Sequence, residues 1–515
     1  MLKQGVLPFY YEAEPTESGM TALGGLPAYL ELAVVAKLAD SIARHLGKRS
    51  IKKQGWTDTQ IVMSLILLNI AGGNSVDDLR ILEGDEGLVR VVEKVGFSGH
   101  PRKERREIER RFRKERKRVF PSPSVVFRYL EAFVNAGEEA KRGMGQAFIP
   151  APSENLLALG RVNPDLLAFA QRRSPATEAT MEMDASIVET SKQDALYSYK
   201  GNQSFQPLSV RWAEQDIVMH SEFRDGNVPA SFQNLRVFRE TLSVLPKGVK
   251  KVYLRSDTAA YQQELLSYCA EGQNERFGVI EFAIGVAITA EFKKAVSEID
   301  ETEWHPLERE IDGNKVATGQ EWAEVCFVPN WTARSKNGPT YRFLAIRELL
   351  RQQTFPGMDV QLPFPTMSKG EKHYKLTGVV TNRNLPGDKL IWWSRERCGK
   401  GEEMHSIMKE DLAGGHFPSA HFGANAAWWA IMVLAFNLNS LMKRLALPEG
   451  WASKRLKAVR FGFINLAGRV VSHSRQLAIR LNGAHPAYAM LLEVRRRLTA
   501  FWLATENPVL ASGSP

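Results

Sequence analysis

Apolar residues recur at helical spacing through the first part of the chain. Residues from about Pro27 to Glu139 have this spacing, and Ile61–Ile70 forms a mainly apolar run within them. Ser75 followed three residues later by Asp78 is typical of a capped helix start. We therefore predict a helical N-terminal region over residues 1–150.

The period changes near Ala179, where the stretch ATMEMDASIVET alternates apolar and polar residues as a strand does. Strands are then predicted at Leu208–Trp212, Ile217–Glu222, Lys251–Ser256 and Val279–Ile288, and helices at Phe232–Leu245 and Tyr261–Ala270. Consecutive strands favour an antiparallel meander, whereas strands separated by helices favour parallel crossovers. A mixed sheet covered by helices, as in a ribonuclease-H-like domain, is the simplest arrangement for residues 175–295.

The remaining chain divides by the same criteria. Residues 296–390 contain short strand candidates between Gly and Pro, at Glu324–Val328, Tyr341–Arg347 and Tyr374–Thr381. Helices are predicted again at Arg397–Leu412 and Asn425–Leu445. The predicted fold class is α/β: a ribonuclease-H-like catalytic domain (175–295 and 391–445), interrupted by a β-rich insertion (296–390) and followed by a helical C-terminal region (446–515).

Composition adds a basic character to this picture. Lys and Arg number 68 against 58 Asp and Glu, which gives a net charge of +10 and favours a polyanionic partner such as nucleic acid. The three cysteines lie far apart, so neither a disulfide framework nor a zinc site is indicated. The apolar runs are too short to span a bilayer and the N-terminus lacks a signal-peptide core, so we expect a cytoplasmic protein without a membrane partner.

The densest basic segment is Arg102–Arg118, with eleven Lys or Arg and four Glu. Such a block is either a solvated helix face or tail, or a surface that binds phosphates if the rest of the chain acts on DNA. On the second interpretation the candidate DNA-binding residues are Arg105, Arg106, Arg110 and Arg113.

Two aspartates stand at strand positions where chemistry is expected. Asp184 lies within the first strand, where an isolated carboxylate is costly to bury, and Asp257 ends the fourth strand. Each alone could face solvent or cap a helix. In a ribonuclease-H-like sheet the first and fourth strands are neighbours, so we expect the two carboxylates to converge.

A third carboxylate is expected from the helix after the insertion. Glu402 and Lys409 are seven residues apart, which places them within ~20° of one another on an ideal helix. His405 lies one turn from Glu402 on the same side. Glu403 points elsewhere, so Glu402 is preferred, although a solvated charge pair is the alternative for this spacing.

These residues resemble the DDE transposases of bacterial insertion sequences. LRSDTAAYQQELL is similar to their second-aspartate segment, and RCGKGEEMHSIMKEDLAGG, NAAWWAIMVLAFNLN and VDDLRILEGDEGL are similar to the insertion-sequence thirteen-eighty group, over roughly residues 30–480. Glu402 with six residues before Lys409 resembles the Glu and Lys of the Tyr-Arg-Glu-Lys signature. The signature's Arg and Tyr positions hold Cys398 and Arg395, and Arg397 and Trp393 stand nearby as substitutes.

The resemblance implies a mechanism. Asp184, Asp257 and Glu402 would be the catalytic residues and would hold two divalent ions, Mg²⁺ or Mn²⁺, as oxygen ligands do. Lys409, with Arg397 and His405, would contact DNA. In related transposases a tryptophan of the insertion stacks on a flipped base, for which the candidates here are Trp304, Trp322 and, in the expected DNA-binding set, Trp331.

The predicted function is cut-and-paste transposition. The partners would be double-stranded DNA, namely the terminal inverted repeats of the element and the target, and a second copy of the chain in a synaptic homodimer. Two alternatives remain open from the sequence: a nuclease of the same fold that hydrolyses without joining, and a domesticated DNA-binding protein. The presence of all three acidic residues argues against the second alternative.

Overall fold

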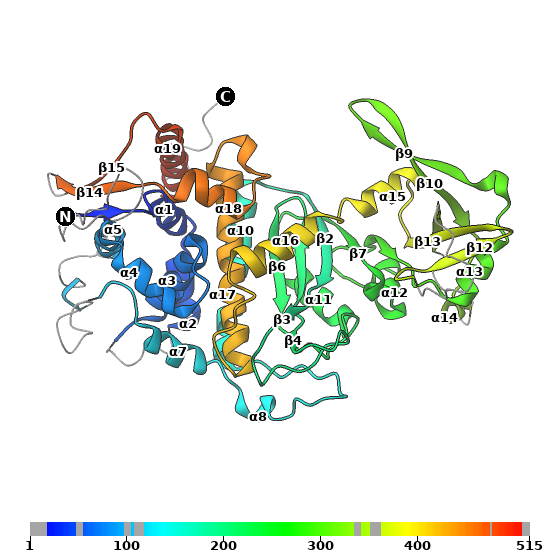
Figure 1. Cartoon of the computed structure of the whole chain (residues 1–515), viewed down its shortest axis with the longest axis horizontal. Helices are drawn as coiled ribbons and strands as arrows, with labels where there is room; N and C mark the ends of the chain where they lie inside the picture. Colours follow the sequence, from blue (N-terminus) through cyan, green and yellow to red (C-terminus); the bar gives the residue numbers. More distant parts are fainter. Residues whose placement is uncertain are drawn as a thin grey trace, which may run out of the picture.

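The computed structural model describes residues 18–47, 55–96, 103, 105–107, 118–333, 341–350, 362–473 and 476–506. Helices from both ends of the chain gather on one side of the molecule, and a long sheet extends away from them (Figure 1). Among the described residues no single helix is long and apolar enough to cross a membrane, and only the bent pair Asp58–Ala71 and Val76–Gly84 passes by length and composition.

The N-terminal region is helical where it is described. Its helices are α1 (Pro27–Val35), α2 (Leu38–Leu46), α3 (Asp58–Ala71), α4 (Leu79–Gly84), α5 (Glu86–Gly96), α7 (Pro123–Glu131), α8 (Ala136–Glu139), α9 (Glu154–Gly160) and α10 (Val162–Arg173). Thr57 starts α3 through a capping box with Gln60. The predicted cap at Ser75 is confirmed, although it begins a 3-10 turn, Val76–Asp78, that leads into α4.

The sheet begins with the strands that the sequence predicted. They are β2 (Glu178–Ala185), β5 (Leu208–Trp212), β6 (Ile217–Glu222), β7 (Lys251–Ser256) and β8 (Glu281–Gly285), with α11 (Asn234–Val244) and α12 (Gln263–Ala270) as crossovers. The spatial order is β6-β5-β2-β7-β8, antiparallel among the first three strands and parallel from β2 to β8. The first and fourth predicted strands, β2 and β7, are therefore neighbours as expected.

Residues 296–390 are rich in strands but do not form a separate sheet. The elements after β8 are α13 (Ala290–Ser297), β9 (His305–Ile311), β10 (Asn314–Val325), α14 (Asn330–Ala333), β11 (Arg342–Leu349), β12 (Thr366–Lys369) and β13 (Lys372–Thr381). Because β13 pairs antiparallel with β8, with Val380 opposite Ile284, these strands continue the sheet that begins with β6. The β9–β10 hairpin projects beyond it (Figure 1).

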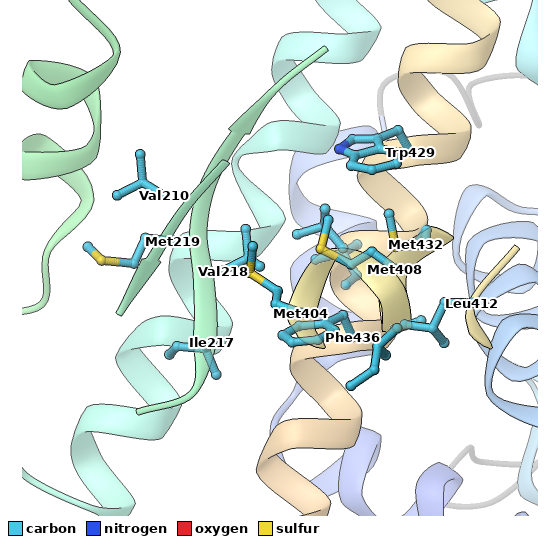
Figure 2. Packing of buried hydrophobic residues seen from close by; sticks show 14 of the residues in the cluster. Val210, Ile217, Val218, Met219, Met404, Met408, Leu412, Trp429, Met432 and Phe436 are labelled. Atoms are coloured by element: carbon cyan, nitrogen blue, oxygen red, sulfur yellow. The ribbon is translucent and has the colours of Figure 1, made fainter. Parts of the chain in front are cut away.

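Helices after β13 return to the first strands. They are α15 (Gly387–Arg395), α16 (Lys400–Ser406) with a π-helical continuation at Ile407–Asp411, and α17 (Phe422–Leu441) with another at Met442–Ala446. Figure 2 shows Val218 of β6, Met404 of α16 and Phe436 of α17 directed toward one another. These side chains are buried, so apolar packing on α17 and β6 fixes one side of α16.

The C-terminal region differs from the expectation that residues 446–515 are helical. It contains α18 (Leu456–Val459), a π-helical turn (Arg460–Ile464), β14 (Gly468–His473), β15 (Gln476–Leu481) and α19 (Pro486–Glu506). β14 and β15 form a hairpin that β1 (Met20–Thr21) extends to three strands. β15 alternates exposed and partly buried residues, a period-2 pattern typical of a strand.

Candidate active site

Asp184 and Asp257 lie at the carboxyl ends of adjacent parallel strands. Met183 of β2 and Ser256 of β7 are register partners, so the aspartates that follow them stand side by side at the edge of the sheet. Asp257 also caps the 3-10 turn Thr258–Ala260, because its Oδ1 accepts a hydrogen bond from the Ala259 N–H at 3.0 Å. The helix-cap interpretation of Asp257 therefore holds together with convergence on Asp184.

The electrostatics of this pair are unfavourable without a cation. Burial raises the pKa of Asp257, and the negative charge of Asp184 raises it further. The hydrogen bond from Ala259 and the positive charge of Arg397 oppose this effect only in part. The edge of the sheet thus concentrates negative charge that an added cation would neutralise.

Helix α16 approaches Asp184 through Gly401 and His405. The His405 Nε2 lies 3.5 Å from Asp184 Oδ2, and a Cβ on Gly401 would lie 3.8 Å from the same oxygen. At ~100° per residue, Glu402 is about 80° around the helix from this direction and Glu403 is about 180° from it. Glu402 is thus nearer to the aspartates, and its side chain is exposed at the rim.

Glu403 faces a different environment. It lines a small cavity together with Asp216 and Lys443 and forms an ion pair with Lys400 at 3.4 Å. The preference for Glu402 over Glu403 remains a prediction, and this geometry supports it. Among the described residues, no three His, Cys, Asp or Glu side chains are arranged closely enough to hold a metal ion.

Lys409 and Arg397 lie beside the same strand end. Lys409 Nζ is 3.5 Å from the Ile187 carbonyl oxygen, three residues beyond Asp184, and Arg397 Nη1 is 4.0 Å from Asp184 Oδ2. The predicted angle of ~20° between Glu402 and Lys409 is wrong, because Lys409 lies in the π-helical segment, where the 3.6-residue repeat does not continue. π-helical turns inside helices are frequent at functional sites.

His405 was predicted to contact DNA, but its side chain is buried against the Asp184 carboxylate. Neither of its ring nitrogens has a hydrogen-bond partner in the described part of the chain. A buried imidazole that makes no hydrogen bond leaves hydrogen-bonding capacity unused, which is unusual in a folded interior. The structure therefore places His405 inside the carboxylate site and not on an exposed surface.

The predicted stacking tryptophans occupy different surroundings. Trp304 is buried beneath the Arg347 guanidinium, and Trp322 packs in a small apolar cluster at the far end of the sheet. Trp331 is partly buried, with its ring centroid 6.2 Å from that of Tyr261. Of the three, Trp331 is therefore the one connected to the Asp257 loop, and its role in DNA binding stays a prediction.

The basic segment can be placed only in part. Arg105 and Arg106 are exposed and helical. Arg110 and Arg113 lie outside the described residues. DNA binding by this segment stays a prediction.

Sequence reasoning did not single out the charged residues behind the aspartates. Glu182 and Arg255, two residues before Asp184 and Asp257, are almost fully buried, and Arg255 Nη2 bonds Glu182 Oε1 at 2.7 Å. The strand period of two could have identified them, because it places residues i and i−2 on one face.

Comparison with known proteins supports a single family. The model of the family described as transposase DDE domain group 1 matches residues 13–501. Among solved structures, a piggyBac transposase synaptic complex with hairpin DNA is similar at 9% identity and a TM-score of 0.33, covering 84% of this chain and 78% of that chain. A search of curated proteins found no match. The family model spans nearly the whole chain, so the protein belongs to the group 1 DDE transposases and is an enzyme that cuts and transfers DNA.

Proposed function

We propose that this transposase moves an insertion sequence by cut-and-paste transposition, with Asp184, Asp257 and Glu402 holding two divalent ions, Mg²⁺ or Mn²⁺. The observation that carries the proposal is the placement of Asp184 and Asp257 side by side at the ends of β2 and β7. When bound, such ions activate the attacking oxygen and stabilise the leaving oxygen in phosphoryl transfer.

The residues at the site fit hard divalent cations. Carboxylate oxygens are the ligands that Mg²⁺ and Mn²⁺ prefer. The pKa of Asp257 is raised, and the buried His405 ring makes no hydrogen bond, so the polar groups of this site are not fully satisfied by the protein alone. Glu402 completes the set when its exposed side chain turns toward the two aspartates.

The other residues of the site would handle DNA and charge. Lys409, beside the strand end after Asp184, would bind a phosphate next to the cut. Arg397 offsets the negative charge of Asp184 and Asp257 while the site is open. The substrates would be the terminal repeats of an element of the insertion-sequence thirteen-eighty type and its target, bound by a synaptic homodimer.

We further infer a ribonuclease-H-like catalytic domain from the strand order. The order β6-β5-β2-β7-β8, with only the first three strands antiparallel, supports this assignment. In that fold two aspartates and a glutamate from a later helix meet at one edge of the sheet. Here Asp184 and Asp257 lie side by side at such an edge, and α16 approaches it through His405.

The test compares two neighbouring glutamates. Glu402→Gln should abolish cleavage of duplex DNA carrying the element end in Mg²⁺, whereas Glu403→Gln should cleave like the wild type. DNA binding and folding should be unchanged in both variants. Normal cleavage by Glu402→Gln would remove Glu402 from the site, and joining of the cleaved end to a target duplex would separate a transposase from a nuclease that only hydrolyses.

A further inference from the structure

A buried ion pair lies directly behind the two aspartates. Glu182 and Arg255 are register partners on β2 and β7, and each precedes its aspartate by two residues. They therefore share the face of the sheet that carries Asp184 and Asp257. Each is only 4% exposed, and the bidentate capacity of the guanidinium suits a carboxylate held this closely.

Arg255 also reaches across to the helix that precedes α16. Its Nη1 donates to the Trp393 carbonyl oxygen at 2.7 Å and to the Glu396 carboxylate. Trp393 belongs to the last turn of α15, and Glu396 is the residue that ends this helix. One side chain thus ties both aspartate strands to the end of α15.

The connection from this anchor to Glu402 is short. After Glu396 only residues 397–399 precede α16, and Gly399 makes the turn with φ of +82°. A left-handed residue of this kind sets the direction of the following helix, and glycine adopts it without strain. The position of the α15 end therefore determines where α16 begins and where Glu402 lies.

Trp393 is held from two sides at this point. Arg255 and Arg383 lie over its ring, with guanidinium carbons 5.2 Å and 4.3 Å from the ring centroid. The Tyr253 ring packs against it in a T-shaped arrangement, with the two ring centroids 5.9 Å apart. The stacking restrains the Trp393 side chain, and the Arg255 hydrogen bonds restrain the backbone at the end of α15.

We infer that Arg255 is a positioning residue that places Glu402 against Asp184 and Asp257. The inference rests on the proposed function, because it assigns to Arg255 a role in assembling that metal site. Lysine would keep the charge but not the planar fork that serves Glu182, Trp393 and Glu396 together.

The same glutamate provides a matched control. Arg211 Nη1 bonds the other oxygen of Glu182 at 2.6 Å, and its remaining nitrogens bond Asp216. Arg211 is as buried as Arg255, but its ion pairs are with Glu182 and Asp216, neither of which belongs to α15. Arg211→Lys therefore disturbs the same buried carboxylate without releasing the helix that leads to Glu402.

The experiment measures Mn²⁺ binding to the full chain by calorimetric titration without DNA. Arg255→Lys should weaken binding about tenfold, in the range that outer-shell substitutions at metal sites produce. Arg211→Lys should change it less than about twofold, even where both variants melt earlier. Equal losses in the two variants, or no loss in Arg255→Lys, would overturn the inference. Glu396→Gln, at an exposed side chain, provides a second variant and should show a smaller loss in the same direction.

A thermodynamic cycle tests whether Arg255 acts through Glu402. In a Glu402→Gln background, Arg255→Lys should cause no further loss of Mn²⁺ affinity, because the ligand that it positions is already gone. Additive losses would show that Arg255 acts on the site by another route. If Glu402→Gln weakens binding and Arg255→Lys does not, only the inference fails. If Glu402→Gln itself leaves binding unchanged, the proposed ligand set fails with it.

Discussion

Removing the charge of Asp257 should stabilise the metal-free protein while abolishing its activity. Asp257→Asn keeps the size of the side chain and its cap on Ala259, since Asn and Asp cap equally well. It removes the repulsion from Asp184 and the cost of burying a charge, the two causes that raise the pKa of Asp257. The conflict between stability and function would then be located at a single carboxylate.

The size of the gain follows from the sheet geometry. Neighbouring strands lie ~4.8 Å apart, and two charges roughly 5 Å apart repel by about 3 kcal/mol at an effective dielectric constant of ~20. Arg397 and the Ala259 hydrogen bond offset part of this repulsion. We therefore expect Asp257→Asn to raise the free energy of unfolding by about 1–2 kcal/mol in EDTA.

The pH dependence identifies the cause. Because the pKa of Asp257 is raised in the folded chain, its contribution to stability is present below the unfolded pKa of 3.8 and is lost as the pH rises through the folded pKa. The advantage of Asp257→Asn should therefore grow with pH. An advantage of equal size at low and neutral pH would refute the electrostatic explanation.

Urea unfolding followed by tryptophan fluorescence measures the effect, with Asp300→Asn as control. Asp300 also caps a 3-10 turn, through a 2.9 Å hydrogen bond from the Thr302 N–H, but its side chain is exposed. Asp300→Asn should therefore not raise the free energy of unfolding. Added Mn²⁺ should stabilise the wild type and not Asp257→Asn, because only the wild type retains both aspartates. Destabilisation of Asp257→Asn in EDTA would contradict the reasoning directly.

Two further predictions concern the ions and the DNA. Cleavage should require Mg²⁺ or Mn²⁺, with Ca²⁺ supporting DNA binding but little chemistry, and undiminished cutting in excess EDTA would exclude the metal mechanism. Replacing Arg105, Arg106, Arg110 and Arg113 with Gln should reduce the slope of log K against log salt by roughly 3 to 4, with similar losses on specific and random duplex. An unchanged slope would make this segment a solvated helix face.

Local patterns were sufficient to predict the strands that carry the aspartates. The alternation around Asp184 and the helices between later strands predict a mixed sheet. The expectation that β2 lies beside β7 came from the strand order of a ribonuclease-H-like sheet, and the structure confirms that pairing. Long-range pairing was not predictable in this way. Nothing in the sequence near Val380 indicates that it pairs with Ile284, so the insertion could not be recognised as an extension of the same sheet.

Two other features of the structure were not predicted from the sequence, for two different physical reasons. A π-helical turn shifts the backbone hydrogen bonds by one residue while leaving the apolar pattern nearly unchanged, so Ile407–Asp411 read as ordinary helix. Arg255 looked like a polar residue of a strand, because its importance depends on contacts with Glu182 and Trp393, which are distant in sequence.

The extended sheet explains how the chain comes back toward the aspartates at the helix that carries Glu402, although the whole insertion lies between them in sequence. The chain leaves β7 at Asp257, builds the outer strands, and comes back through β13 to the position beside β8. Since strands are ~4.8 Å apart, β13 ends only about 10 Å from β7. From there α15 and α16 lead toward β2, and Arg255 hydrogen-bonds the last turn of α15. The placement of Glu402 thus depends on the β8–β13 pairing and the Arg255 anchor, whereas β9, β10 and β11 lie beyond this path.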